Sequence, residues 1–150
     1  MTYRMLVVLT GVVLTGLIAR AEIRTRPVEY SDGDTVLEGY LAWDDAVSDP
    51  RPGVLVVHQW KGLGDYEQRR SRELAALGYV ALAVDMYGKG VRPGTAEEAG
   101  KQAGLFKDDR ALTRTRAAAG WQALKDTGLT GDRPVAVMGY CFGGMVALEL

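Results

Sequence analysis

The chain has 150 residues, of which 47% are hydrophobic and 25% charged, and its formal net charge at pH 7 is −1. This length and composition are typical of one folded globular domain and exclude a disordered protein. The near-zero charge and the lack of a basic block do not indicate a nucleic-acid partner. One cysteine and one histidine exclude an internal disulfide framework and a metal site of the His/Cys type, and we expect no cofactor.

The first 21 residues have the parts of a secretory signal peptide. Arg4 supplies a positive charge, Met5 to Ile18 form an apolar run of 14 residues, and Ala19-Arg20-Ala21 has the small residues of a cleavage site. Because a membrane span needs about 20 apolar residues, this run favours cleavage before Glu22 over an uncleaved anchor, which is the alternative. We therefore expect a periplasmic or secreted protein without a stable membrane anchor, whose mature domain covers residues 22–150.

A β-hairpin is predicted at the start of the mature chain. Ile23 to Tyr30 and Thr35 to Trp43 have strand character, and Ser31-Asp32-Gly33-Asp34 between them has the composition of a turn. Asp44 to Gly53 is polar and contains two prolines, which indicates a connection on the surface.

Strands and helices alternate after the hairpin. Three apolar runs without polar alternation are predicted as strands covered on both faces: Gly53–Val57, Tyr79–Val84 and Val135–Met138. Helical segments are predicted at Tyr66–Leu77, Ala96–Phe106, Asp108–Lys125 and from Met145 onward. The second of these is interrupted by Gly100 and Gly104 and is expected to be weak. This alternation predicts an α/β fold with a mostly parallel sheet, flanking helices and the N-terminal hairpin.

Two helices allow more detailed predictions. In the first, Asp65 is the expected N-cap, and Leu74 and Leu77 are expected to face inward. In the third, the apolar spacing predicts the following inward face: Leu112, Thr115, Ala119 and Ala123.

The segment around Cys141 has the pattern of a nucleophile elbow. Gly139-Tyr140-Cys141-Phe142-Gly143 follows a predicted strand and precedes a predicted helix. A sharp turn of this kind lifts one reactive side chain above the sheet, and its glycines allow the strand and helix backbones to approach closely. The alternative interpretation is an ordinary buried cysteine.

Three separated motifs together resemble the dienelactone hydrolase family of the α/β-hydrolase fold. They are His58-Gln-Trp-Lys-Gly-Leu, Gly78-Tyr-Val-Ala-Leu-Ala-Val-Asp-Met-Tyr-Gly and Gly139-Tyr-Cys-Phe-Gly-Gly, and the likeness covers roughly Val28 to Leu150. The resemblance implies cleavage of a small-molecule ester or lactone through a cysteine nucleophile, Cys141, with a thioester intermediate. It also implies two backbone donors for the oxyanion, the N–H groups of Phe142 and Trp60.

The resemblance also suggests substrate-binding residues. The family has a carboxylate in the position of Gln59, and an amide cannot take a proton from the thiol. A basic residue after the Asp-x-Tyr motif is associated with the substrate carboxylate in the family, and Lys89 occupies about that place, with Arg92 nearby. We expect His58 to hold its loop through hydrogen bonds rather than to act as a base, and Asp85 to cap the following turn.

The order of catalytic residues in this fold predicts where the remaining triad residues lie along the chain. The acid and the histidine follow the nucleophile along the chain, so both are expected beyond Leu150. The chain is therefore expected to be the N-terminal portion of a hydrolase domain, to be inactive alone, and to leave Val135–Met138 as an exposed apolar edge. The alternative is a non-catalytic truncated or binding module that keeps half the fold.

Overall fold

The computed structural model describes residues 22–150, and the predicted signal peptide at residues 1–21 lies outside the described residues. The elements follow in the order β1 (Ile23–Asp32), β2 (Thr35–Asp44), β3 (Gly53–Val57), α1 (Asp65–Ala76), β4 (Val80–Val84), α2 (Ala96–Asp108), α3 (Arg110–Asp126), β5 (Val135–Gly139) and α4 (Phe142–Glu149). Within residues 22–150, no helix has the length and apolar character that a membrane span requires.

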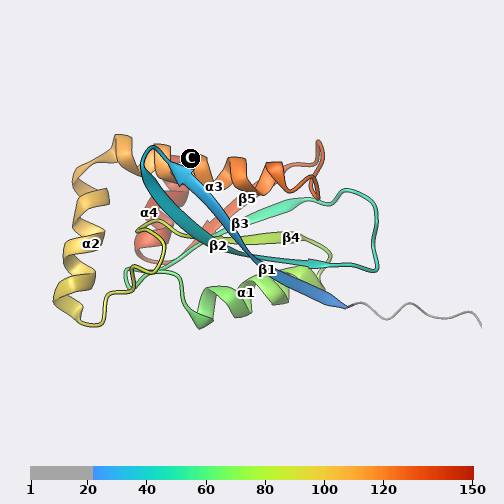
Figure 1. Cartoon of the computed structure of the whole chain (residues 1–150), viewed down its shortest axis with the longest axis horizontal. Helices are drawn as coiled ribbons and strands as arrows, with labels where there is room; N and C mark the ends of the chain where they lie inside the picture. The colour runs from blue at the N-terminus through green and yellow to red at the C-terminus, as the bar shows by residue number, and fades with distance from the viewer. Residues whose placement is uncertain (1–21) are drawn as a thin grey trace, which may run out of the picture.

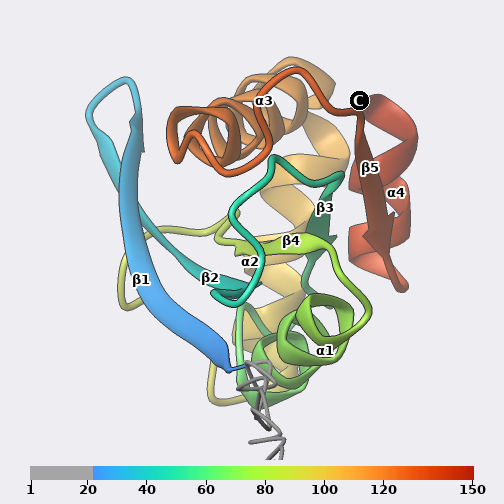
Figure 2. The same ribbon diagram turned by 90° about the vertical axis from the view of Figure 1, so that its right-hand side faces the viewer.

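The five strands form one mixed sheet in the spatial order β1-β2-β4-β3-β5 (Figures 1 and 2). Strands β4, β3 and β5 are parallel to one another. The antiparallel β1–β2 hairpin joins this parallel part because Tyr40–Ala42 of β2 pair with Ala81–Ala83 of β4. The predicted α/β architecture, with a mostly parallel sheet and an N-terminal hairpin, is confirmed. Strand β5 forms one edge of the sheet, as expected.

Helices cover both faces of β3 and β4, which explains why these two strands are continuous apolar runs. The prediction that Val135–Met138 is covered on both faces is wrong, because β5 lies at the edge of the sheet and none of its residues is fully buried. Val54 and Val56 of β3 point to the α1 side, where they join Leu63 and Leu74. Leu55 and Val57 point to the opposite side and enter a larger core with residues of α3 and α4. Figure 2 shows α1 and α3 on opposite sides of the sheet, with α4 beside β5. The two cores hold the carboxyl ends of the strands in a fixed arrangement.

The predicted boundaries of α1 are wrong at both ends. Gly64, not Asp65, is the N-cap, because the Glu67 carboxylate accepts the Gly64 N–H at 3.0 Å. Leu77 was expected to face inward but is 74% exposed. The helix ends at Ala76, so Leu77 is the C-cap residue and leaves the buried face. Leu74 is half-buried against the sheet.

The inward face of α3 also differs from the prediction, because a polar residue lies at its centre. Arg116 is buried, and its guanidinium donates to Asp32 Oδ2 at 2.9 Å and to the Met86 carbonyl at 3.0 Å. The buried set is Thr113, Arg116, Ala117, Gly120, Ala123 and Leu124. Thr115, predicted to face inward, is exposed. Spacing of apolar residues alone could not identify a face organised by an arginine.

Helix α2 forms over its full length in spite of its two glycines. Its N-terminus has a capping box, in which the Thr95 hydroxyl accepts the Glu98 N–H at 3.2 Å and the Glu98 carboxylate accepts the Thr95 N–H at 3.3 Å. The box pairs two backbone donors that the first helical turn would otherwise leave open, which offsets the low helix propensity of glycine.

Two glycine-to-alanine substitutions are expected to have opposite effects on stability. A Cβ on Gly120 would lie 2.6 Å from Cγ1 of Val84, so Gly120→Ala should lower the free energy of unfolding by about 1–3 kcal/mol. Gly100 of α2 has no neighbour within 4 Å of a built Cβ, so Gly100→Ala should raise it by up to about 1 kcal/mol. Urea unfolding monitored by circular dichroism measures both. Equal effects of the two substitutions would contradict the packing of α3 on β4.

Candidate active site

The three sequence motifs meet at the end of the sheet where β3, β4 and β5 have their carboxyl termini. Val57 of β3 pairs with Val84 of β4 and with Gly139 of β5, so the carboxyl ends of these strands are level. The residues that follow them, His58, Asp85 and the elbow at Cys141, therefore lie at the same end of the sheet. In open α/β sheets, binding sites form at this end.

Cys141 has a strained backbone. Its φ of 56° and ψ of −117° make it the non-glycine residue with a positive φ within residues 22–150. Such a conformation costs about 1–3 kcal/mol and is maintained only where the surrounding structure imposes it. The side chain is exposed rather than buried, which disagrees with an ordinary core cysteine. The turn has the geometry that a nucleophile elbow requires.

Close approach of two backbones explains the glycines of the elbow. A Cβ on Gly139 would lie 2.3 Å from the carbonyl carbon of Gly143, and a Cβ on Gly143 would lie 2.4 Å from the Val57 carbonyl oxygen. A Cβ on Gly144 would be 3.4 Å from the Gly139 oxygen. The first two positions therefore admit only glycine without a backbone shift, while the third has room for a methyl group.

Cys141 lies at a cavity of about 520 Å³. The lining residues are Trp60, Lys107, Arg110, Cys141, Phe142 and Met145. Within residues 22–150, the backbone N–H groups of Trp60 and Phe142 have no hydrogen-bond acceptor. Both donors thus belong to residues that line the same cavity as the sulfur.

His58, which follows β3, is a structural residue at this end of the sheet. It is fully buried, its Nε2 accepts the Met86 N–H at 3.2 Å, and its Nδ1 lies 2.5 Å from the Gln59 carbonyl oxygen. Burial lowers the pKa of His58 to about 4, although the hydrogen bond with Gln59 and the negative charge of Asp85 oppose this shift. The imidazole is therefore neutral at pH 7 and both its nitrogens are occupied.

Asp85 organises the loop after β4. It is fully buried, and its Oδ1 accepts the N–H groups of Tyr87 at 3.0 Å and Gly88 at 3.2 Å, which is the capping role expected for it. The Tyr30 hydroxyl contacts both the Asp85 N–H, at 2.9 Å, and the Asp85 carbonyl, at 3.0 Å. Burial raises the pKa of Tyr30, so this hydroxyl keeps its proton. The hairpin thereby holds the loop that carries Tyr87, whose hydroxyl donates to the Trp60 carbonyl at 2.9 Å.

The model of the Dienelactone hydrolase family matches residues 37–150. The chain belongs to this family. It is 40% identical, with a TM-score of 0.82, to a dienelactone hydrolase-like promiscuous phosphotriesterase from metagenomic libraries, over 87% of this chain and 54% of that one. The protein m3DLH is 37% identical with a TM-score of 0.82, over 85% of this chain and 53% of that one. Protein usf of Aquifex pyrophilus is 29% identical over 81% of this chain and 52% of its own length. The chain thus spans about half the length of these relatives.

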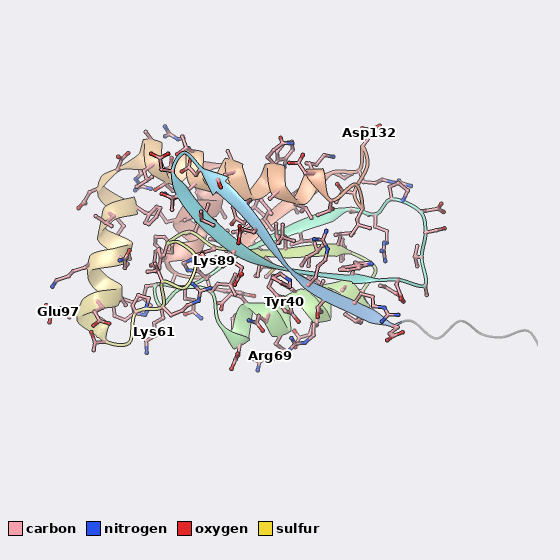
Figure 3. All side chains as sticks on the ribbon, viewed as in Figure 1. Tyr40, Lys61, Arg69, Lys89, Glu97 and Asp132 are labelled. Atoms are coloured by element: carbon pink, nitrogen blue, oxygen red, sulfur yellow. The ribbon has the colours of Figure 1, made fainter. Side chains whose placement is uncertain are left out.

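The substrate-binding residues predicted for this family member lie apart from the sulfur. Gln59 and Arg92 line a neighbouring cavity of about 620 Å³, which adjoins the first at Trp60. Lys89, which is labelled in Figure 3, forms ion pairs with Glu29 and, at 3.4 Å, with Glu38, and both glutamates belong to the hairpin. Neither Gln59 nor Lys89 lines the cavity that contains Cys141. Their assignment to substrate binding stays a prediction, whereas Cys141, Phe142 and Trp60 are brought together.

Sequence reasoning missed two cationic residues of the cysteine cavity. Lys107 comes from the end of α2 and Arg110 from the start of α3, and Arg110 also pairs with Glu149 at 2.9 Å. Their positive charges at the cavity can attract an anionic group of a ligand. No motif marks them, because they are placed only by the sharp turn between α2 and α3. The junction Lys107-Asp108-Asp109-Arg110 carries no net charge, so counting charges does not mark these residues either.

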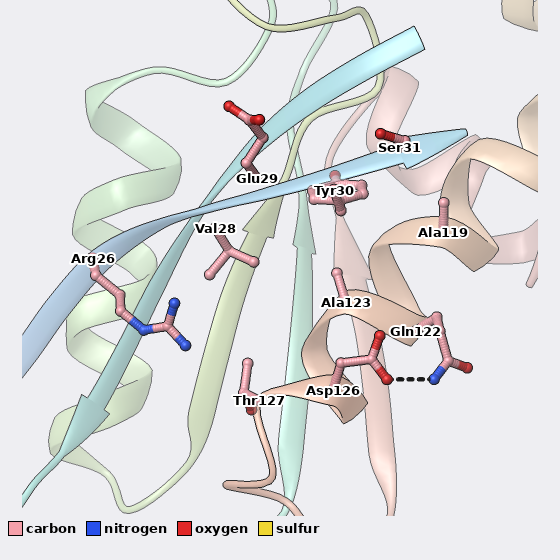
Figure 4. Close-up of a pocket in the computed structure, with 10 residues that line it drawn as sticks. All are labelled: Arg26, Val28, Glu29, Tyr30, Ser31, Ala119, Gln122, Ala123, Asp126 and Thr127. Carbon is pink, nitrogen blue, oxygen red and sulfur yellow. Dashed lines mark hydrogen bonds between the residues drawn. The ribbon is translucent and has the colours of Figure 1, made fainter. Parts of the chain in front are cut away.

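Another hollow of about 520 Å³ lies between β1 and α3 (Figure 4). Its lining includes Arg26, Tyr30, Ala123 and the hydrogen-bonded pair Gln122 and Asp126, which are 2.7 Å apart. It shares no residue with the cysteine cavity. Across residues 22–150, no group of three or more His, Cys, Asp or Glu side chains is arranged to hold a metal ion. The cavity at Cys141 is therefore the candidate active site.

Proposed function

We propose that this chain contributes the nucleophile and the oxyanion donors of an ester or lactone hydrolase, with Cys141 as the attacking group. The observation that carries this proposal is the strained, exposed Cys141 at a cavity shared with Trp60 and Phe142. Membership of the dienelactone hydrolase family supports the reaction class. A non-catalytic module, the alternative, has no need of a backbone strain that places a thiol in a cavity.

The proposed chemical step is acyl transfer to sulfur. The thiol proton leaves to solvent, the sulfur lone pair forms a bond to the carbonyl carbon, and the carbonyl π electrons move to oxygen. The N–H groups of Trp60 and Phe142 donate to this oxyanion. When the C=O bond re-forms, the C–O bond to the leaving group breaks and its electron pair leaves with the alkoxide or phenolate. The product is a thioester on Cys141.

Release of the acyl group requires attack by water, and this step needs a general base. Within residues 22–150, no histidine or carboxylate forms a hydrogen bond with Cys141, and both nitrogens of His58 are occupied. We therefore propose that the 150-residue chain accepts one acyl group from an activated ester and turns over slowly. The cavity volume suits a small-molecule substrate, and Lys107 and Arg110 favour an acyl group that carries negative charge.

A rapid-mixing experiment with p-nitrophenyl acetate tests this proposal. We expect a burst of p-nitrophenolate equal to one equivalent of protein, followed by a slow phase. Because the chain has one cysteine, prior alkylation with iodoacetamide blocks a single thiol and provides the control. A burst that survives alkylation, or no burst in the untreated protein, would overturn the assignment of Cys141.

A further inference from the structure

We infer that His58 and Tyr87 are positioning residues that aim the Trp60 N–H into the cysteine cavity. This inference rests on the proposed function, since it assigns the Trp60 N–H to the oxyanion. Neither side chain lines the cavity. Each instead holds one of the two peptide groups that flank the Cα of Trp60.

The first peptide group joins Gln59 to Trp60. Its carbonyl oxygen lies 2.5 Å from Nδ1 of His58 and also accepts the Gly62 N–H at 3.3 Å. All peptide bonds of the described residues are trans, so the N–H of this unit points away from its carbonyl. Holding the carbonyl against the buried imidazole therefore directs the Trp60 N–H outward, on the side away from His58.

The tautomer of His58 follows from its partners. The Met86 N–H can only donate, so Nε2 must carry the lone pair and Nδ1 must carry the proton. Nδ1–H then donates to the Gln59 carbonyl. Met86 is itself held through its carbonyl by Arg116, which is paired with Asp32 at the tip of the hairpin. The orientation of the imidazole thus depends on α3, which carries Arg116, and on the β1–β2 hairpin, which carries Asp32.

The second peptide group joins Trp60 to Lys61. Its carbonyl accepts the Tyr87 hydroxyl proton at 2.9 Å. The rings of His58 and Tyr87 are in edge contact, with their centroids 4.7 Å apart. Both rings pack on the ring of Phe142, with centroid distances of 5.6 Å and 5.5 Å. Phe142 supplies the other proposed oxyanion donor. The packed rings of His58, Tyr87 and Phe142 therefore fix the positions of the two donor N–H groups relative to each other.

Comparison of two reactions at Cys141 tests this inference. Acylation by p-nitrophenyl acetate develops an oxyanion, whereas alkylation by iodoacetamide does not, so a displaced oxyanion donor slows only acylation. Tyr87→Phe removes the hydroxyl and keeps the ring, and we expect acylation to slow about tenfold with alkylation unchanged. Tyr40→Phe is the matched control, because the Tyr40 hydroxyl bonds the exposed Arg72 on the other side of the sheet.

Substitutions of His58 add a graded series. His58→Asn keeps a donor near the position of Nδ1 and should retain more acylation than His58→Leu, whose folding is checked by circular dichroism. Tyr87→Phe acylation at the unaltered rate, or a parallel fall in acylation and alkylation, would overturn the positioning role. Absence of acylation in the unaltered chain would instead contradict the proposed function.

NMR spectroscopy, which does not depend on activity, distinguishes failure of the positioning role from failure of the proposed function. Because His58 is the one histidine of the chain, its ¹⁵N resonances can be assigned without ambiguity. We expect a protonated Nδ1 and an unprotonated Nε2 at pH 7, and faster hydrogen exchange of the Trp60 amide in Tyr87→Phe. The opposite tautomer, or unchanged exchange, would contradict the positioning of the Trp60 peptide whatever the outcome of the kinetic assays.

Discussion

Replacement of Cys141 by alanine is expected to lower the rate of p-nitrophenolate release by at least about 10³-fold, to the rate without protein. The variant lacks the sulfur to which the acyl group is transferred, and the chain has no second cysteine to replace it. The remaining oxyanion donors cannot complete a transfer without a nucleophile. Stopped-flow absorbance with p-nitrophenyl acetate measures the loss, and urea unfolding verifies that the variant is folded.

The serine variant makes this prediction sharper. A cysteine is partly ionised near neutral pH and reacts without assistance, whereas a serine hydroxyl needs an adjacent base. Among the described residues, no histidine or carboxylate forms a hydrogen bond with Cys141, and both nitrogens of His58 are occupied. The rate of p-nitrophenolate release by Cys141→Ser should therefore also fall to background. Gly100→Ala, on the exposed side of α2, is the control that should keep the full burst. A burst in the alanine variant would show that another residue is acylated.

Acidification is expected to destabilise the protein through His58, by up to about 3 kcal/mol between pH 6.5 and 4. Burial lowers the pKa of the folded-state imidazole to about 4, from an ordinary value of 6.5. Between these values the unfolded chain binds a proton that the folded chain does not, so the free energy of unfolding falls as the pH falls. Below about 4 both states are protonated and the loss is complete.

The contribution of His58 can be isolated with a variant that does not titrate. Carboxylates also titrate at acid pH, and the imidazole interacts with the charges of Asp85 and Arg92. The pH dependence of the unaltered chain should therefore be compared with that of His58→Asn by urea unfolding at several pH values. The difference in free energy should fall from pH 6.5 to 4. A difference that is constant with pH would show that His58 is not held neutral.

Most of the fold could be predicted because its strands have strong local signals. The run Gly53–Val57 lacks polar alternation, and the structure covers both of its faces, as that pattern requires. The helix faces were less predictable, since Arg116 is buried by partners 30 and 84 residues away in sequence. No spacing rule contains that information.

The candidate site also has a part that the sequence predicts and a part that it does not. Cys141, Phe142 and Trp60 belong to motifs that end neighbouring strands, so the parallel register brings them together. Lys107 and Arg110 reach the cavity from a helix junction that carries no motif. Lys89 was assigned by its position in a motif, but its ion pairs with Glu29 and Glu38 depend on the hairpin that crosses the sheet. Tertiary contacts, rather than sequence position, decide where these cations lie.

Mass spectrometry of the acid-quenched reaction with p-nitrophenyl acetate tests the nucleophilic role of Cys141 most directly. We predict one acetyl group per chain, located by fragmentation on Cys141 and removed by neutral hydroxylamine, as expected for a thioester. An acetyl group on a lysine or at the N-terminus, with Cys141 unmodified, would show that Cys141 is not the nucleophile.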